Sequence, residues 1–184
     1  TEITDEASYS SIIKAKVGKH DVYIQMTAGG LVGIDANNGK KLFSEKVGVN
    51  GIAIIPTPIF HDNKVYVTSD YKAGCGLVSL TPTDSGIVSK IVYENKVMEN
   101  HHGGVVLLDG HIYGASGNCN DRNARWKCQN MLTGEAKWES EKLNQTGSLT
   151  VAGGRLYVYG QNDGTVVLVE PSTKEWVETG RFKI

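Results

Sequence analysis

Short stretches in which apolar and polar residues alternate run along the whole chain, and turns rich in glycine, asparagine and aspartate separate them. In one unit the stretches GGVVLL, HIYGAS, RWKCQ and EAKWE are each five or six residues long, a common length for a β-strand. The turns Asp109-Gly110 and Thr133-Gly134 belong to this unit, and glycine adopts the positive φ of a tight hairpin without steric cost. Because no helical spacing of apolar residues is sustained, the unit predicts four antiparallel strands.

The same plan occurs four times. A strand centred on tyrosine marks each copy and recurs every 43 to 47 residues, as HDVYIQ, NKVYVT, GHIYGA and GRLYVY. Repeats of about 40 to 50 residues with four strands each are typical of β-propeller blades. The predicted fold class is therefore all-β, a β-propeller of four-stranded antiparallel blades. Residues 1–184 form one propeller region, with blades predicted over residues 9–47, 51–98, 101–142 and 144–184.

The repeated aromatic residues are predicted to be structural, because a catalytic residue seldom needs four equivalent copies. The tyrosines of the second strands are expected in the core, at Tyr23, Tyr66, Tyr113 and Tyr157. An aromatic side chain near the start of each fourth strand should lie between neighbouring sheets, where it would bury roughly 150 to 250 Å². These blade-docking residues are Phe43, Tyr93, Trp138 and Trp176.

The repeat resembles that of a known family. The stretch VAGGRLYVYGQNDGTVVLVEPSTKEW resembles one blade of the pyrroloquinoline-quinone (PQQ)-type repeat, in which Asp-Gly and Thr-Gly turns precede a tryptophan. The stretch WKCQNMLTGEAKW has the Thr-Gly turn and Trp138 at the expected places. The resemblance extends from about Tyr9 to the last residue and implies a PQQ-like propeller of the quinoprotein alcohol dehydrogenase-like superfamily. Since that family usually closes seven or eight blades, we expect these four to be part of a larger ring.

The resemblance implies two functional classes. Some members are PQQ-dependent alcohol or sugar dehydrogenases, and others are cofactor-free propellers in the periplasm or outside the cell. In the enzymes a disulfide between adjacent cysteines often caps the quinone, which stacks on a tryptophan beside a calcium ion. This sequence has no adjacent cysteine pair. We therefore expect a periplasmic or secreted binding or protein-interaction scaffold without a cofactor; the alternative is part of a quinoprotein dehydrogenase that uses PQQ and calcium.

Candidate ligand-binding residues lie where the repeat is interrupted. They are Glu99, Asn100 and His102 in VMENHHGG, Asn118 in the loop GNCNDRNARW, and Trp126, which heads a third strand at a possible blade rim. A carbohydrate-binding propeller would need exposed aromatic residues around the channel, and Trp126 is the candidate for that role.

We predict no metal site in this sequence. Calcium prefers several oxygen ligands, which Glu99 with Asn100, or Asn118, Asn120 and Asp121, would offer. However, no D-x-D-x-D-G spacing is present, and Asn and Asp clusters are common in turns. One metal should rarely bind both His101 and His102, because adjacent strand residues point to opposite faces.

The three cysteines are dispersed. Cys119 and Cys128 lie on the two arms of a predicted hairpin loop, so a disulfide between them is possible, and Cys75 is left over. No cysteine has an identifiable base partner, and no serine lies in a G-x-S-x-G turn, so nucleophilic catalysis has no support.

Charge and composition exclude several classes of partner. The formal net charge is -1, with 19 Lys and Arg against 20 Asp and Glu, so no polybasic surface attracts nucleic acid. No apolar run approaches the roughly 20 residues of a membrane span, and TEITDEASYSS is unlike a signal peptide. GxxxxGK and GxGxxG nucleotide motifs are absent. We therefore expect the partner to be a protein or a small molecule, which the sequence does not identify. Either self-association or missing blades would complete the propeller.

Overall fold

A computed structural model describes residues 3–117 and 124–184. In this part of the chain sixteen strands form four antiparallel sheets, which we call blades 1 to 4. Blade 1 contains β1(Ile13–Val17), β2(His20–Thr27), β3(Gly30–Asp35) and β4(Lys41–Glu45). Blade 2 contains β5(Ile59–His61), β6(Lys64–Ser69), β7(Gly74–Pro82) and β8(Ile87–Asn95). Blade 3 contains β9(Val105–Leu108), β10(His111–Ser116), β11(Arg125–Asn130) and β12(Ala136–Ser140). Blade 4 contains β13(Gly147–Ala152), β14(Arg155–Gly160), β15(Thr165–Glu170) and β16(Val177–Lys183).

Each blade is an up-and-down meander, since hydrogen-bonded neighbours in every sheet are consecutive in sequence. The predicted turn chemistry closes these hairpins: Asp109 and Gly110 join β9 to β10 with φ values of 47° and 74°. Four four-stranded antiparallel meanders in succession confirm the predicted fold class, an all-β chain of propeller blades.

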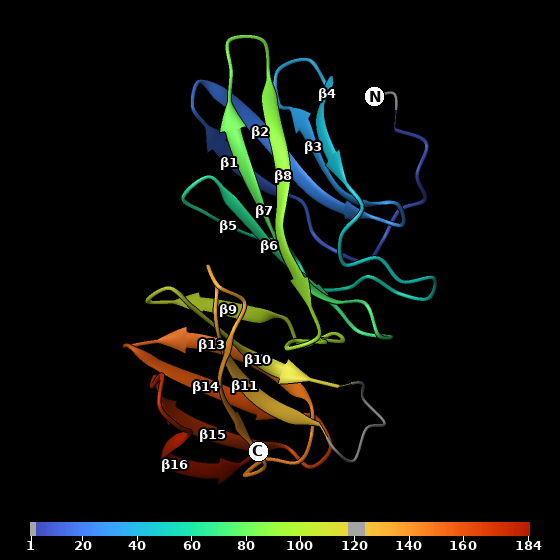
Figure 1. Cartoon of the computed structure of the whole chain (residues 1–184). Helices are drawn as coiled ribbons and strands as arrows, with labels where there is room; N and C mark the ends of the chain where they lie inside the picture. The colour runs from blue at the N-terminus through green and yellow to red at the C-terminus, as the bar shows by residue number, and fades with distance from the viewer. Residues whose placement is uncertain (1–2, 118–123) are drawn as a thin grey trace.

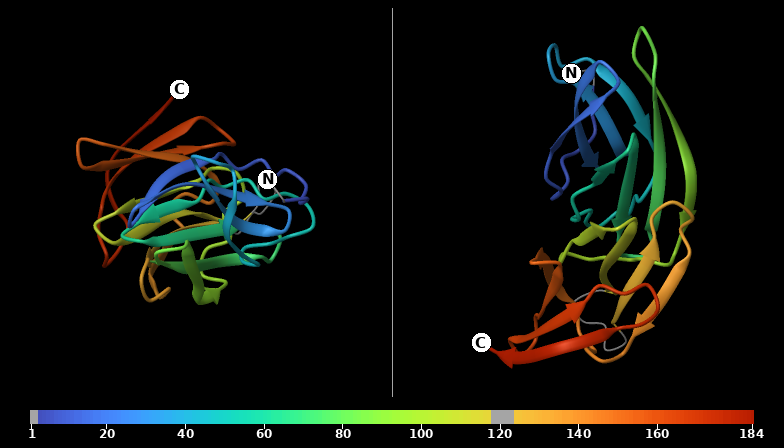
Figure 2. Two further views of the ribbon diagram at one scale, coloured as in Figure 1. Left: turned by 90° about the horizontal axis from the view of Figure 1, so that it is seen from above. Right: turned by 90° about the vertical axis from the view of Figure 1, so that its left-hand side faces the viewer.

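The blades follow one another in a curved row. Figures 1 and 2 show blade 1 and blade 4 at its two ends, with blades 2 and 3 between them. Consequently blades 2 and 3 are covered on both faces, whereas blades 1 and 4 each turn one face away from the other blades.

Three apolar clusters join the blades. Blades 1 and 2 share an aliphatic core that includes Val22, Ile24, Met26, Val65 and Val67. Blades 2 and 3 meet at Tyr66, Leu77, Met98, Ile112 and Met131. Blades 3 and 4 meet at Tyr113, Trp126, Leu156, Val158 and Trp176. Burial of these side chains is the main force that fixes each blade on the next.

In blade 1 the side chains that face the next blade are shifted by one residue relative to those in blades 2 and 3. Tyr66 and Tyr113 are 1% and 3% exposed and pack against the following blade. In β2 the neighbours Val22 and Ile24 are fully buried instead, and Tyr23 is 42% exposed. Because successive strand residues point to opposite faces, a shift of one residue moves a side chain out of the core. The prediction that Tyr23 is a core residue is therefore wrong, and Tyr157, predicted in the same way, is only half-buried.

Candidate functional site

The candidate residues around the histidine pair lie in the segment that joins β8 to β9. The strand expected at His101 and His102 begins only at Val105. The two imidazoles are therefore not held on opposite faces of a sheet. Their Nδ1 atoms lie 3.1 Å apart, and the rings meet edge to face with centroids 4.9 Å apart.

Tyr71 extends this pair from the neighbouring blade. Its hydroxyl lies 3.1 Å from Nε2 of His101, and the two rings are also edge to face, with centroids 5.3 Å apart. Tyr71 follows β6 of blade 2, whereas His101 precedes β9 of blade 3. We call Tyr71, His101 and His102 the histidine cluster. It joins two blades, and His102 is its exposed member.

The turn that presents Tyr71 has an unusual backbone. Tyr71 and Lys72 have φ values of 57° and 66°, in the left-handed region that favours glycine. The amide of Ala73 donates a 3.2 Å hydrogen bond to the carbonyl of Asp70 and closes the turn. The ammonium of Lys96 donates to the carbonyl of Ala73 at 2.9 Å. Each left-handed non-glycine residue costs about 1–2 kcal/mol, so other contacts must hold this turn in place.

Burial lowers the pKa of His101 below its ordinary value, and the nearby His102 lowers it further. The carboxylate of Asp70 opposes these two effects. The net result favours a neutral His101 imidazole at neutral pH, in which one ring nitrogen carries a proton and the other is an acceptor.

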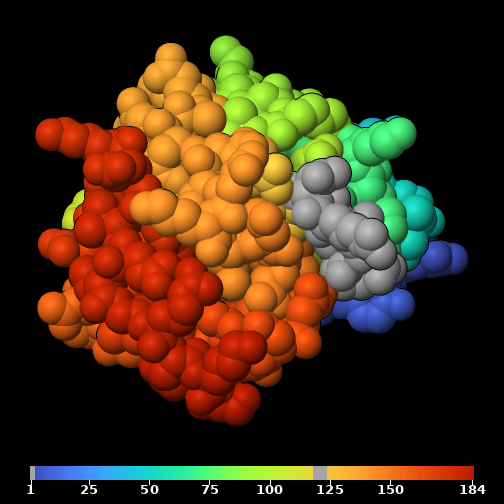
Figure 3. Space-filling model, turned by 90° about the horizontal axis from the view of Figure 1, so that it is seen from below, coloured from blue at the N-terminus to red at the C-terminus, as the bar shows by residue number. Residues whose placement is uncertain are grey.

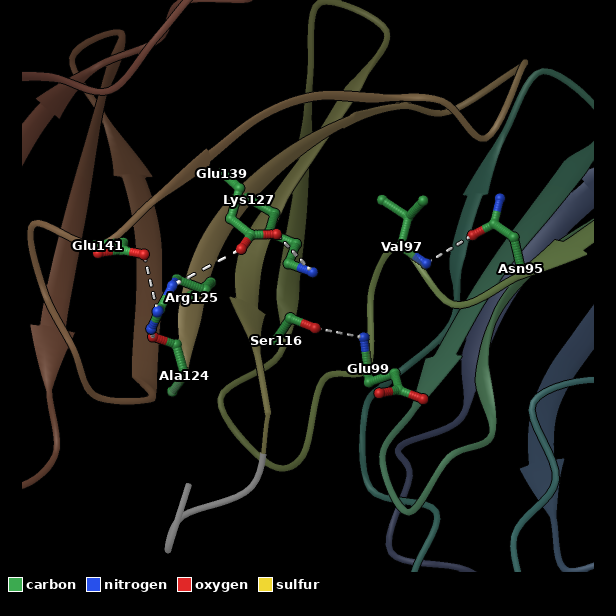
Figure 4. A network of polar contacts seen from close by, with 9 residues as sticks. All are labelled: Asn95, Val97, Glu99, Ser116, Ala124, Arg125, Lys127, Glu139 and Glu141. Atoms are coloured by element: carbon green, nitrogen blue, oxygen red, sulfur yellow. Dashed lines mark hydrogen bonds and ion pairs between the residues drawn. The ribbon is translucent and has the colours of Figure 1, made fainter. Parts of the chain in front are cut away.

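Glu99 and Asn100 make mainly backbone and interblade contacts. Asn100 is 1% exposed, and its side-chain amide donates to the carbonyl of Ala115 at 2.8 Å. Its backbone amide donates to Oγ1 of Thr68 at 3.2 Å. The backbone amide of Glu99 donates to Oγ of Ser116 at 3.0 Å, as Figure 4 shows. Asn100 thus ties blade 2 to blade 3 from a buried position, while its side-chain oxygen is buried without a hydrogen-bond partner, and its role as a ligand-contacting residue stays a prediction.

Trp126 is also a core residue. It is 1% exposed, and its indole N–H donates to the carbonyl of Gln145 at 3.0 Å. Its ring lies against Trp176, with centroids 6.2 Å apart. The predicted position of Trp126 at an exposed rim is wrong, and the carbohydrate-binding interpretation loses its aromatic candidate. Asn118 lies outside the described residues.

The blade-docking aromatic residues lie at blade interfaces. Phe43 is buried in the cluster between blades 1 and 2. The Tyr93 hydroxyl donates to the carbonyl of Met131 in blade 3 at 2.8 Å. The Trp138 indole donates to the carbonyl of Ser172 in blade 4 at 2.7 Å, and Trp176 is buried beside it.

Among the described residues the cysteines are free and buried, at Cys75 and Cys128. Cys128 lies in the cluster between blades 3 and 4, and burial raises its pKa to about 11. Because Cys128 is free, it does not form the disulfide that its place opposite Cys119 made possible. Cys119 itself lies outside the described residues.

Within residues 3–117 and 124–184, no group of three or more His, Cys, Asp or Glu side chains is arranged to hold a metal ion. The same part of the chain contains no helix long and apolar enough to cross a membrane.

A second candidate surface is the outer face of blade 4, which Figure 3 views from below. Tyr159, Val166 and Phe182 form one row across three strands, because each is the register partner of the next. Tyr157 and Leu168 form the adjacent row. Tyr159 and Phe182 are 37% and 49% exposed. We call these five residues the blade 4 face.

Comparisons with known proteins give a likeness in structure and none in sequence. No family model matches the sequence, and no curated protein matches it. Among solved structures, the chain is similar to a chain in the crystal structure of a nidogen/laminin complex, with a TM-score of 0.42 and 10% identity. The match covers 96% of this chain and 81% of that chain. A likeness of this size carries no information on function, so the description as a propeller rests on the four sheets themselves.

Proposed function

We propose that this chain is a PQQ-like propeller that acts outside the cytoplasm as a protein-interaction scaffold, and that the blade 4 face is its contact surface. The observation that carries the proposal is the exposure of Tyr159 and Phe182 on a sheet face whose counterparts in blades 2 and 3 are covered. Exposed apolar faces of this kind mark protein interaction sites.

The repeat indicates what kind of partner would fit. Tyr66 of blade 2 is covered by Ile112 and Met131 of blade 3, and Tyr113 of blade 3 is covered by aliphatic residues of blade 4. Tyr157 is the next member of this series. Its neighbours Leu156 and Val158 face blade 3 and are buried, so Tyr157 points away from it. The matching partner is therefore a polypeptide sheet with an aliphatic face.

Light scattering over a range of protein concentrations tests the proposal, together with binding of a hydrophobic fluorescent dye. The variant Phe182→Ser should reduce either self-association or dye binding, and Val88→Ser, at an exposed valine of blade 2, is the matched control. Concentration-dependent dimers that Phe182→Ser weakens would identify a second copy as the partner. A monomer whose dye binding falls in Phe182→Ser would show that the blade 4 face is an accessible apolar surface and would exclude a second copy as its partner. A monomer whose dye binding is the same in both variants would overturn the proposal.

The alternative function is part of a PQQ-dependent alcohol or sugar dehydrogenase. PQQ and calcium added to the protein should then give dye-linked oxidation of alcohols or sugars, together with quenching of tryptophan fluorescence. The scaffold proposal expects neither signal. Oxidation above the rate of free PQQ and calcium would favour the enzyme and contradict the scaffold.

A further inference from the structure

We propose that His101 and His102 bind a transition-metal ion of the Cu²⁺, Ni²⁺ or Zn²⁺ class between their Nδ1 atoms. This inference does not depend on the proposed scaffold function, since the blade 4 face and the histidine cluster share no residue. It reverses the expectation that the two imidazoles are held on opposite faces of a strand.

The spacing of the two nitrogens fits such an ion. The Nδ1 atoms lie 3.1 Å apart. Metal–imidazole bonds are about 2.0–2.1 Å long, so two cis ligands place their nitrogens about 2.9 Å apart at right angles and about 3.4 Å apart in a tetrahedron. The observed separation lies between these values, and a small rotation of the exposed His102 ring would open room for the ion.

Tyr71 supplies a contact that metal-binding histidines commonly have. A ligating imidazole usually hydrogen-bonds through its other ring nitrogen, which fixes the ring orientation. In His101 that nitrogen is Nε2, and it lies 3.1 Å from the Tyr71 hydroxyl. When Nδ1 binds the ion it is the bare ring nitrogen, and Nε2 carries the single hydrogen of the neutral imidazole, which it donates to the Tyr71 hydroxyl oxygen. Tyr71 is a positioning residue here, and its strained turn in blade 2 holds it against His101.

Ligand chemistry indicates the class of ion. Neutral imidazoles suit copper, nickel and zinc, whereas calcium and magnesium prefer oxygen ligands. Asp70 adds a negative charge close to His101 and is 6% exposed. With two protein ligands the remaining positions are open to water, so we expect modest affinity, with Cu²⁺ the tightest of the three in the Irving–Williams order.

The competing explanation is a plain hydrogen bond between two neutral imidazoles, with no affinity for metals beyond that of any surface histidine. Titration of the protein with Cu²⁺, Ni²⁺ and Zn²⁺, followed by calorimetry, separates the two. The variant His102→Ala removes one ligand at an exposed position and should leave the fold intact. Its unfolding temperature, measured without metal and compared with that of the wild type, checks this. The variant His61→Ala removes an exposed histidine at the end of β5, outside the histidine cluster, and is the matched control.

We expect His102→Ala to weaken Cu²⁺ binding at least about tenfold, Tyr71→Phe to weaken it less, and His61→Ala to leave it unchanged. Electron paramagnetic resonance of the Cu²⁺ complex should show two nitrogen ligands in the wild type and one in His102→Ala. Equal Cu²⁺ affinity in the wild type and His102→Ala would overturn the proposal, as would a spectrum without two equatorial nitrogens.

Discussion

The hydroxyl of Tyr66 in blade 2 donates a 2.7 Å hydrogen bond to the side-chain oxygen of Gln129 in blade 3. Gln129 is fully buried, and its amide nitrogen donates to the carbonyl of Gly134 at 2.8 Å. Asn95 of blade 2 donates to the same carbonyl at 2.9 Å. Polar groups inside this apolar interface are therefore paired across it, which fixes the register of blade 3 on blade 2.

Tyr66→Phe should lower the free energy of unfolding by about 1–3 kcal/mol, because it leaves the buried oxygen of Gln129 with only the weak thiol donor of Cys75, 3.6 Å away. Urea unfolding followed by fluorescence measures the change. Tyr159→Phe, which removes a hydroxyl at a 37% exposed position, is the control and should be nearly neutral. Equal stability of the two variants would show that the interblade hydrogen bond contributes nothing.

Turn chemistry and strand alternation were sufficient to predict the four sheets, whereas the facing of individual side chains was not always predictable. Tyr23 lies in the same local sequence pattern as Tyr66. In blade 1, however, the neighbours of the tyrosine face blade 2, so the Tyr23 side chain lies on the opposite, outer face of the sheet. Gln129 reads as an exposed strand position, because glutamine is seldom buried. Its burial depends on partners in blade 2, and no local pattern in RWKCQ reports them.

The histidine cluster illustrates a different limit of the sequence. A strand through His101 and His102 would turn the two imidazoles to opposite faces, but β9 starts at Val105. Tyr71 carries no signal at all, since a tyrosine in a left-handed turn is uncommon and glycine is the residue that the turn favours. The contact between Tyr71 and His101 arises from the packing of blade 2 on blade 3. The local sequence around either residue does not predict that contact.

Gly33→Ala should destabilise blade 1. A Cβ atom at this position would lie 2.0 Å from Cε1 of the Phe43 ring, which is buried between blades 1 and 2. The ring would have to move within a packed core, and overpacking of this kind costs about 1–3 kcal/mol. Gly86→Ala is the control, since a Cβ there meets nothing within 4 Å. Thermal unfolding of the two variants gives the comparison, and equal midpoints would contradict the close approach of Phe43.

The thiol of Cys128 should be unreactive in the folded protein. Burial raises its pKa to about 11, so the thiolate that attacks thiol reagents is scarce at neutral pH. In a Cys119→Ser variant, we expect Ellman's reagent to label neither Cys75 nor Cys128 until denaturant is added. In the wild-type chain, denatured without reductant, Cys128 should also react. Failure to react there would show that it is held in a disulfide with Cys119 after all.

Acid should weaken blade 4 through Asp163. A hydrogen bond from the Gln145 amide, at 2.9 Å, lowers the pKa of this carboxyl, and Lys183, 2.9 Å away, and Thr165 lower it further. Because the folded pKa lies below the unfolded value of about 3.9, the stabilisation is complete at neutral pH and is lost as pH falls below about 4. Asp163→Asn should therefore flatten the acid limb of a plot of unfolding free energy against pH. Asp84→Asn, which removes one charge from an exposed turn, is the control for net charge, and identical acid limbs in both variants would exclude this role for Asp163.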